Sequence, residues 1–138
     1  MEYIFSFDEK EYVLGKDNLE YFVNDEEQEL KGIDPNKILE LLKNSDEVDF
    51  QNAYYESCCS NCKAGKEEKK KVFDFLEYYF YVYGKDNNFV TSSIDSEYDK
   101  KSFTRLNREG IVDKSYMVTV IVCKHCGTYA VEIEEFEV

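Results

Sequence analysis

Two pairs of cysteines with the same spacing constrain this chain more than any other feature of its sequence. Cys59 and Cys62 form the first Cys-x-x-Cys pair, and Cys123 and Cys126 form the second. Two intervening residues let a tight turn direct both sulfur atoms at one ion, and four thiolates fill the tetrahedral shell of a structural zinc ion. The spacing therefore predicts one Zn²⁺ bound by these four cysteines in support of folding, with iron as the alternative metal because it also accepts four thiolates.

The residues around the two pairs differ. Gly127 follows the second pair, where such a turn often needs a positive φ that glycine adopts without a Cβ penalty, whereas Lys63 follows the first, so we expect a less regular first turn. Cys58 could replace Cys59 only with a Cys-x-x-x-Cys spacing. The single histidine, His125, lies inside the second turn, and its side chain is expected to point away from the metal.

The long separation of the two pairs does not exclude a shared ion. Sixty residues lie between Cys62 and Cys123. Closing a loop of this length instead of one of about 15 residues costs roughly 1.2 kcal/mol more, whereas a structural zinc ion contributes about 10–16 kcal/mol. Metal binding therefore outweighs the cost of closing the loop.

Length and composition indicate one folded domain, residues 1–138, in the cytoplasm. Apolar residues make up 43% of the chain, too much for a disordered protein. The first ten residues carry acidic side chains where a signal peptide would be basic, and no apolar run is long enough to span a membrane. The five cysteines are an odd number, which argues against a disulfide framework.

The net charge of −13 makes nucleic acid an unfavourable partner, because Lys and Arg contacts to phosphates supply most of the affinity in such complexes. Two local basic runs are the exceptions, and acidic residues interrupt both. We interpret them as solvated helix faces, with a binding patch as the alternative. The first run contains Lys63, Lys66, Lys69, Lys70 and Lys71, and the second contains Lys100, Lys101, Arg105 and Arg108.

Hydrophobic periodicity and capping residues predict an α+β fold, an antiparallel sheet with two or three helices. Asp34 and Pro35 are typical of a helix start, and Ser102 and Gly110 favour a short helix between them. Three- and four-residue steps of apolar residues predict a longer helix from Lys66 to about Gly84. Because Leu76 to Tyr83 is apolar at every position except Glu77, the alternative for this end of the segment is a strand. The predicted strands are residues 2–7, 11–14, 19–23, 48–55, 117–122 and 129–133, and residues 85–96 are predicted to form a loop.

The segment Cys123-Lys-His-Cys126-Gly127 resembles one half of a zinc ribbon, and Cys59-Ser-Asn-Cys62 supplies the other half. The resemblance implies ribbon-like elements at residues 54–65 and 116–134, with residues 66–115 as a helical insertion. It also implies Cys59, Cys62, Cys123 and Cys126 as the ligands, but no activity. The whole chain in addition resembles a family of small, acidic bacterial proteins of unknown function.

The function predicted from these features is that of a non-catalytic protein-interaction or regulatory module with a protein partner or self-association. No catalytic motif or acid/base pair is evident. The alternative is a thiol-disulfide redox protein, because a strand, Cys59-Ser-Asn-Cys62 and a helix would resemble a thioredoxin-like site. An interaction surface could come from five tyrosines, which either form an exposed patch or pack at the core edge: Tyr54, Tyr55, Tyr78, Tyr81 and Tyr83.

Overall fold

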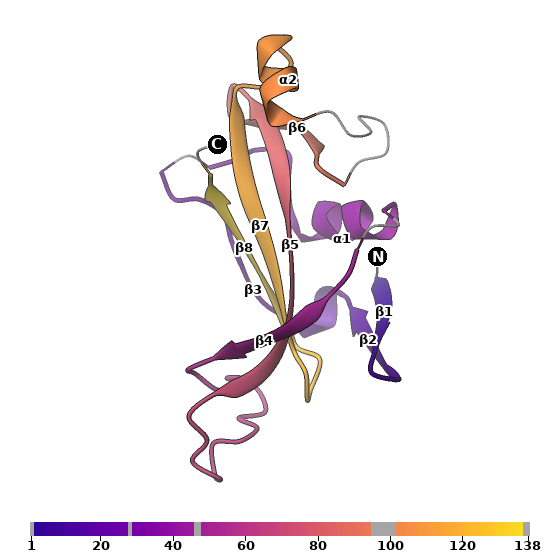
Figure 1. Cartoon of the computed structure of the whole chain (residues 1–138), viewed down its shortest axis with the longest axis vertical. Coiled ribbons are helices and arrows are strands. Elements are labelled where there is room, and N and C mark those ends of the chain that lie inside the picture. Colours follow the sequence, from indigo (N-terminus) through magenta and orange to yellow (C-terminus); the bar gives the residue numbers. More distant parts are fainter. Residues whose placement is uncertain (1, 28, 46–47, 95–101, 137–138) are drawn as a thin grey trace.

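The computed structural model describes residues 2–27, 29–45, 48–94 and 102–136. Its centre is a long six-stranded sheet with the strand order β3-β8-β7-β5-β4, in which β6 also pairs with β5 (Figure 1). A separate hairpin, β1–β2, and helix α1 lie together on one side of this sheet. The elements are β1 (Tyr3–Phe7), β2 (Lys10–Leu14), β3 (Leu19–Val23), α1 (Pro35–Lys43), β4 (Gln51–Tyr55), β5 (Phe73–Lys85), β6 (Asn88–Ser92), α2 (Phe103–Arg108), β7 (Lys114–Cys123) and β8 (Tyr129–Glu135).

The predicted α+β fold with two or three helices is wrong. The part of the chain that the structure describes is mostly β, with 45% strand, 14% helix and one helix of seven or more residues. The sheet is also mixed, because β3 runs parallel to β8 while the other pairs are antiparallel. The predicted helix from Lys66 to Gly84 is instead a turn-rich loop followed by β5, a strand of 13 residues.

The helix prediction for β5 is wrong and the strand alternative is confirmed from Leu76 to Tyr83, where apolar side chains lie on both faces. Leu76, Phe80 and Val82 face the main core, while Tyr79 and Tyr81 belong to the other face. A strand with apolar side chains on both faces has an almost continuous apolar sequence, and continuous runs contain helical spacings by chance. Aromatic residues favour strands, and β5 pairs with β7 over ten residue pairs, which decides its conformation.

Most of the local predictions are confirmed. The strands predicted at residues 2–7 and 11–14 form and pair as a hairpin. Its turn residues Asp8 and Glu9 both have positive φ, as a tight two-residue hairpin turn requires. Helix α1 starts where predicted, since Asp34 Oδ1 accepts a hydrogen bond from the Lys37 backbone N–H at 2.7 Å. Ser102 caps the six-residue helix α2 in the same way.

The main core fills the space between one face of the sheet and the layer formed by α1 and the β1–β2 hairpin. Val118, Val120 and Val122 of β7 are fully buried at its centre, and Ile38 and Leu42 of α1 pack against this sheet face. Burying a side chain of this size contributes about 1.5–3 kcal/mol, so this layer supplies most of the stability. We call this side of the sheet the covered face.

The opposite side of the sheet, which we call the open face, is covered only in part. Helix α2 packs at one end, where Leu106 and Val112 contact Tyr83. Strand β6 lies near the same end. The prediction of a loop at residues 85–96 is therefore wrong for the residues of β6, and residues 95–96 lie outside the described residues. The cysteine-bearing loops lie at the other end of the sheet (Figure 1).

Within the described residues, no helix has the length and apolarity needed to cross a membrane.

Candidate metal centre

Two hairpins of the sheet bring the cysteine pairs together. The loop of residues 56–72 connects β4 to β5, and residues 124–128 connect β7 to β8. Phe75 at the start of β5 pairs with Cys123 at the end of β7, so both connections lie at the same end of the sheet. The sixty residues between Cys62 and Cys123 therefore include β5, which runs away from the site, and β7, which returns to it, so the predicted helical insertion at residues 66–115 is wrong.

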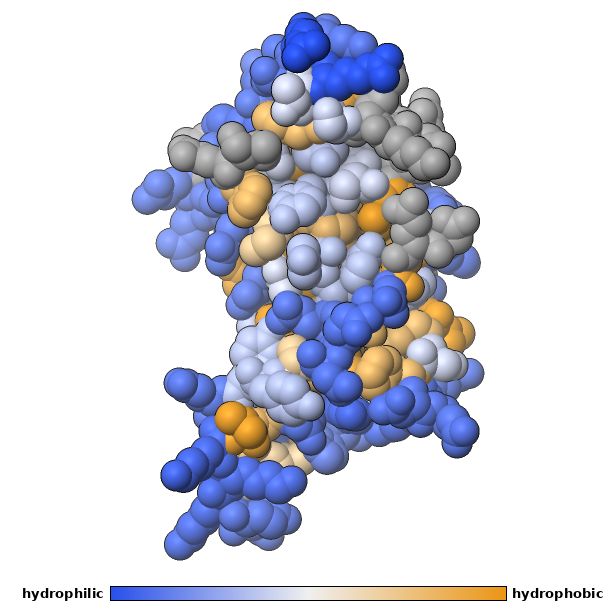
Figure 2. All heavy atoms as spheres, viewed as in Figure 1, coloured by the Kyte–Doolittle hydropathy of each residue, from blue (hydrophilic) through white to orange (hydrophobic). Residues whose placement is uncertain are grey.

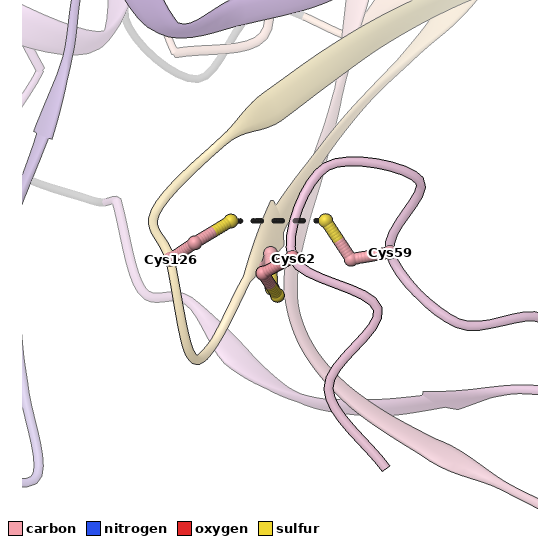
Figure 3. A group of neighbouring side chains, drawn as sticks. Cys59, Cys62 and Cys126 are labelled. Carbon is pink, nitrogen blue, oxygen red and sulfur yellow. Dashed lines mark hydrogen bonds between the residues drawn. The ribbon is translucent and has the colours of Figure 1, made fainter. Parts of the chain in front are cut away.

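The four sulfur atoms form one compact cluster. They all lie within 4.8 Å of one another. The Cys59 and Cys126 sulfurs are 3.7 Å apart (Figure 3). The Cys62 and Cys123 sulfurs are 3.6 Å apart, so each short contact joins the two loops. A zinc–sulfur bond of about 2.3 Å gives sulfur–sulfur separations of about 3.8 Å along a tetrahedron edge. The four cysteines therefore could hold a metal ion with little rearrangement.

The two Cys-x-x-Cys turns have the same backbone geometry. We call residues 59–63 the first knuckle and residues 123–127 the second knuckle. Lys63 N–H donates to the Cys59 carbonyl at 2.8 Å, and Gly127 N–H donates to the Cys123 carbonyl at 2.9 Å. Lys63 and Gly127 both have positive φ, 53° and 81°. Lysine therefore adopts the left-handed conformation that was expected of glycine, and the first knuckle forms the same turn without a glycine.

The thiols at the centre are arranged for a cation. Burial raises the pKa of Cys59, and it raises the pKa of Cys123 to about 12, although backbone N–H groups within each knuckle point at these sulfurs and lower it in part. Burial also raises the pKa of Cys126, but hydrogen bonds from Thr128 and Asn61 outweigh burial and lower it to about 6. A divalent cation among the sulfurs would displace the thiol protons and neutralise thiolates that are otherwise costly to bury.

Two residues that the sequence analysis did not single out connect the knuckles. Asn61 Nδ2 donates to the Cys126 sulfur at 3.6 Å and to Thr128 Oγ1 at 3.0 Å. Thr128 Oγ1 lies 3.2 Å from the same sulfur. Such contacts to a ligand atom orient it and tune its basicity. The sequence could have indicated these two residues only by their position, because Asn61 lies between two of the cysteines and Thr128 lies two residues after Cys126. Only the fold shows that Asn61 reaches the opposite knuckle.

The N-terminal region supports the backbone of the second knuckle. Lys10 Nζ donates to the carbonyls of Lys124 and His125 at 3.0 and 2.9 Å, and the Tyr12 hydroxyl donates to the Lys124 carbonyl at 2.8 Å. Asn18 Nδ2 donates to the Gly127 carbonyl at 2.9 Å. These contacts hold the turn in place independently of the sulfurs.

The other cysteine and the histidine lie outside the sulfur cluster. Cys58 is half-buried and Cys59 takes its place in the cluster, in agreement with the regular Cys-x-x-Cys spacing. His125 is exposed and contributes no ligand atom to the group.

The lysines of the first basic run are exposed on the loop of residues 56–72, not on a helix. Figure 2 shows that the end of the molecule formed by this loop is mostly hydrophilic. Lys100 and Lys101 of the second run lie outside the described residues.

The five tyrosines do not form one exposed patch. Tyr54 is 64% exposed, whereas Tyr83 is 7% exposed and buried against α2. Tyr55 and Tyr81 are half-buried, and Tyr78 packs against the main core on the covered face. The alternative interpretation, in which these rings pack at the core edge, describes all of them except Tyr54.

Comparison with known proteins places the whole chain in one family. No curated protein and no solved structure matches it at a significant level, so the resemblance to zinc ribbons is not confirmed. The model of a protein family of unknown function, DUF3785, matches residues 3–138. The chain, with its four clustered cysteines at one end of a mixed sheet, therefore belongs to the DUF3785 family.

Proposed function

We propose that this protein is a non-catalytic binding or regulatory module, and that one structural Zn²⁺ on Cys59, Cys62, Cys123 and Cys126 fixes its fold. The observation that carries the proposal is the sulfur cluster, in which two separate hairpin loops meet and all four sulfurs lie within 4.8 Å of one another. A metal shared by two loops fastens one end of the sheet, which a chain without disulfides cannot do covalently.

The ligand set supports a structural ion over a catalytic one. Catalytic zinc sites keep a position open for water and normally include histidine or carboxylate ligands, whereas four cysteines close the coordination shell. No described histidine or carboxylate joins the cluster. Free thiols stay reduced in the cytoplasm, so this is the compartment that we propose.

The structure gives little support to the redox alternative at Cys59 and Cys62. A thioredoxin-like site lowers the pKa of its first thiol with a helix that begins at the motif. Here the segment after Cys62 is a turn-rich loop that leads into β5, and burial raises the pKa of Cys59. The nearest sulfur neighbour of each cysteine also lies on the other knuckle.

Elemental analysis of protein purified under reducing conditions tests the proposal, together with a count of reactive thiols before and after chelation. We expect one zinc per chain, one fast-reacting thiol from Cys58 and four further thiols that react only after chelation. One iron per chain would retain the site but change the metal. A metal-free protein in which Cys59 and Cys62 readily form a disulfide would overturn the proposal in favour of redox chemistry.

A further inference from the structure

A groove of about 540 Å³ crosses the open face of the sheet beside the metal centre. Its floor is apolar and includes Phe75 of β5, Met117 and Ile121 of β7, and Ala130 of β8. The first knuckle, including Cys59, forms the wall at one end. The volume lies in the range of pockets that hold small ligands or a few residues of a peptide.

The rim of this groove is acidic. Glu20, Glu77, Glu132 and Glu134 line it, and no lysine, arginine or histidine is found among its described lining residues. Because the whole chain also carries a charge of −13, the electrostatic field at the groove favours a cation.

Two tyrosine–glutamate pairs stand on opposite sides of the floor. The Tyr21 hydroxyl donates to Glu132 Oε1 at 3.1 Å on the β3 and β8 side, and the Tyr55 hydroxyl donates to Glu77 on the β4 and β5 side. Burial, the hydrogen bond to Glu77 and the charges of Glu77 and Glu132 raise the pKa of Tyr55, so the two pairs lie within electrostatic reach of each other. Each carboxylate keeps lone pairs for a further donor, and each ring offers a face for a cation.

We propose that this groove binds a Lys- or Arg-bearing segment of a protein partner. The aliphatic part of the basic side chain would lie over Met117, Ile121 and Ala130, and its charged group would lie between Glu77 and Glu132. This inference rests on the proposed function, because it gives the proposed binding module its binding surface.

The surroundings of the groove favour a peptide segment of a different protein. Tyr21, Val23 and Tyr79 are exposed on the open face, and Phe136 contacts Tyr81 there, so four of the eight exposed large hydrophobic residues of the described chain gather on it. Such a patch is typical of a protein interaction site. A second copy of the chain would bring another charge of −13 to an acidic surface, and a bare metal ion would gain nothing from the apolar floor.

A direct binding experiment uses the full-length, metal-loaded protein and a fluorescein-labelled heptapeptide in which Lys and Leu alternate. We expect saturable binding by fluorescence anisotropy at physiological salt, and no binding of the same peptide with Glu in place of Lys. In amide NMR spectra, the Lys peptide should shift the signals of Thr119, Ile121 and Ala130, while those of Ile38 and Leu42 on the covered face stay unchanged.

The matched variants remove equal charge inside and outside the groove. Glu77→Gln with Glu132→Gln keeps an acceptor for each tyrosine hydroxyl, and we expect affinity for the Lys peptide to fall on the order of tenfold. Glu26→Gln with Glu27→Gln changes two exposed residues that do not line the groove, and affinity should change less than about twofold.

Several results would overturn the inference. The first is the absence of saturable binding, or equal binding of the Glu peptide and the Lys peptide. The second is an equal loss of affinity in the Glu26 and Glu27 variant and in the Glu77 and Glu132 variant. The third is NMR shifts confined to the covered face, or a concentration-dependent dimer that dissociates when the Lys peptide is added. The NMR mapping uses the unmodified chain, so it decides the question even if the Glu77 and Glu132 variant fails to fold. If the purified protein contains zinc but does not bind the peptide, the proposed groove is wrong and the proposed metal site stands. If the protein is purified without metal and still binds the peptide, the proposed metal site is wrong and the proposed groove stands.

Discussion

The two knuckles share one turn geometry but differ in what holds them. The second knuckle joins two strands of the sheet directly and accepts hydrogen bonds from Lys10, Tyr12 and Asn18. The first knuckle lies in the 56–72 loop, which has no helix or strand of its own. It contacts the second knuckle through Asn61 and the sulfurs.

This difference indicates a division of roles at the metal centre. With the proposed metal, the second knuckle would be positioned by the fold before the ion arrives, whereas the first knuckle would depend on the ion for its position. A preformed pair of ligands lowers the ordering cost of binding, and the pair with fewer other contacts would then close the shell. Because the first knuckle also forms a wall of the open-face groove, the metal would determine the shape of that groove.

The largest effect is expected from metal removal. Chelation should release the 56–72 loop and leave the second knuckle in place, because only the first lacks other support. Trypsin cleaves after lysine, and Lys63, Lys66 and Lys69 are exposed in this loop, while Lys124 Nζ is bound to Asn52 Oδ1 at 2.9 Å. Peptide mapping by mass spectrometry should find new cuts within residues 63–71. Simultaneous cleavage at Lys124 would show that both knuckles depend equally on the metal.

Substitution of single cysteines should separate ligands from bystanders. Cys59→Ser removes a buried ligand, so we expect substoichiometric zinc and a loss of more than about 4 kcal/mol in the free energy of unfolding. Cys58→Ser, at the neighbouring half-buried position, should retain full zinc and change stability by less than about 0.5 kcal/mol. Elemental analysis and denaturant unfolding measure both quantities, and a reversed order would make Cys58 the ligand.

Smaller effects are expected at the link between the knuckles. Thr128→Val removes the hydroxyl next to the Cys126 sulfur with little change in shape, and Asn61→Ala removes the donor that crosses from the first knuckle. Each should weaken zinc affinity about tenfold, as judged by competition with a chelating dye. Ser60→Ala, on an exposed residue of the same knuckle, serves as the control. Unchanged zinc affinity in both variants would mean that Asn61 and Thr128 do not help to position the Cys126 sulfur.

The smallest effects should have opposite signs at equivalent positions. Gly127→Ala places a Cβ no closer than 4.0 Å to Tyr12, so only the positive φ of 81° disfavours it, by about 1 kcal/mol. Lys63→Gly relieves a φ of 53° and should stabilise the protein by about 0.5 kcal/mol. Thermal unfolding measures the change in stability of each variant relative to the unmodified protein. If both variants are destabilised, or both are stabilised, the two knuckles are not equivalent turns.

The local signals of the sequence were sufficient for the small elements and for the cysteine set. Asp34 and Ser102 marked helix starts because a cap acts on backbone groups only a few residues away. The Cys-x-x-Cys spacing indicated the four residues that cluster, because two intervening residues fix where a tight turn directs its side chains. Both inferences depend on short-range geometry.

The tertiary structure decided the conformation of residues 66–92, the parallel pairing of β3 with β8, and the open-face groove. Phe75 to Tyr83 has spacings that suit a helix or a strand that is apolar on both faces, and only pairing with β7 selects the strand. Asn61 and Glu132 each gain their partner from a strand or loop distant in sequence. The cysteine pattern was thus set by the sequence, whereas the way those cysteines meet depends on long-range pairing that no local pattern encodes.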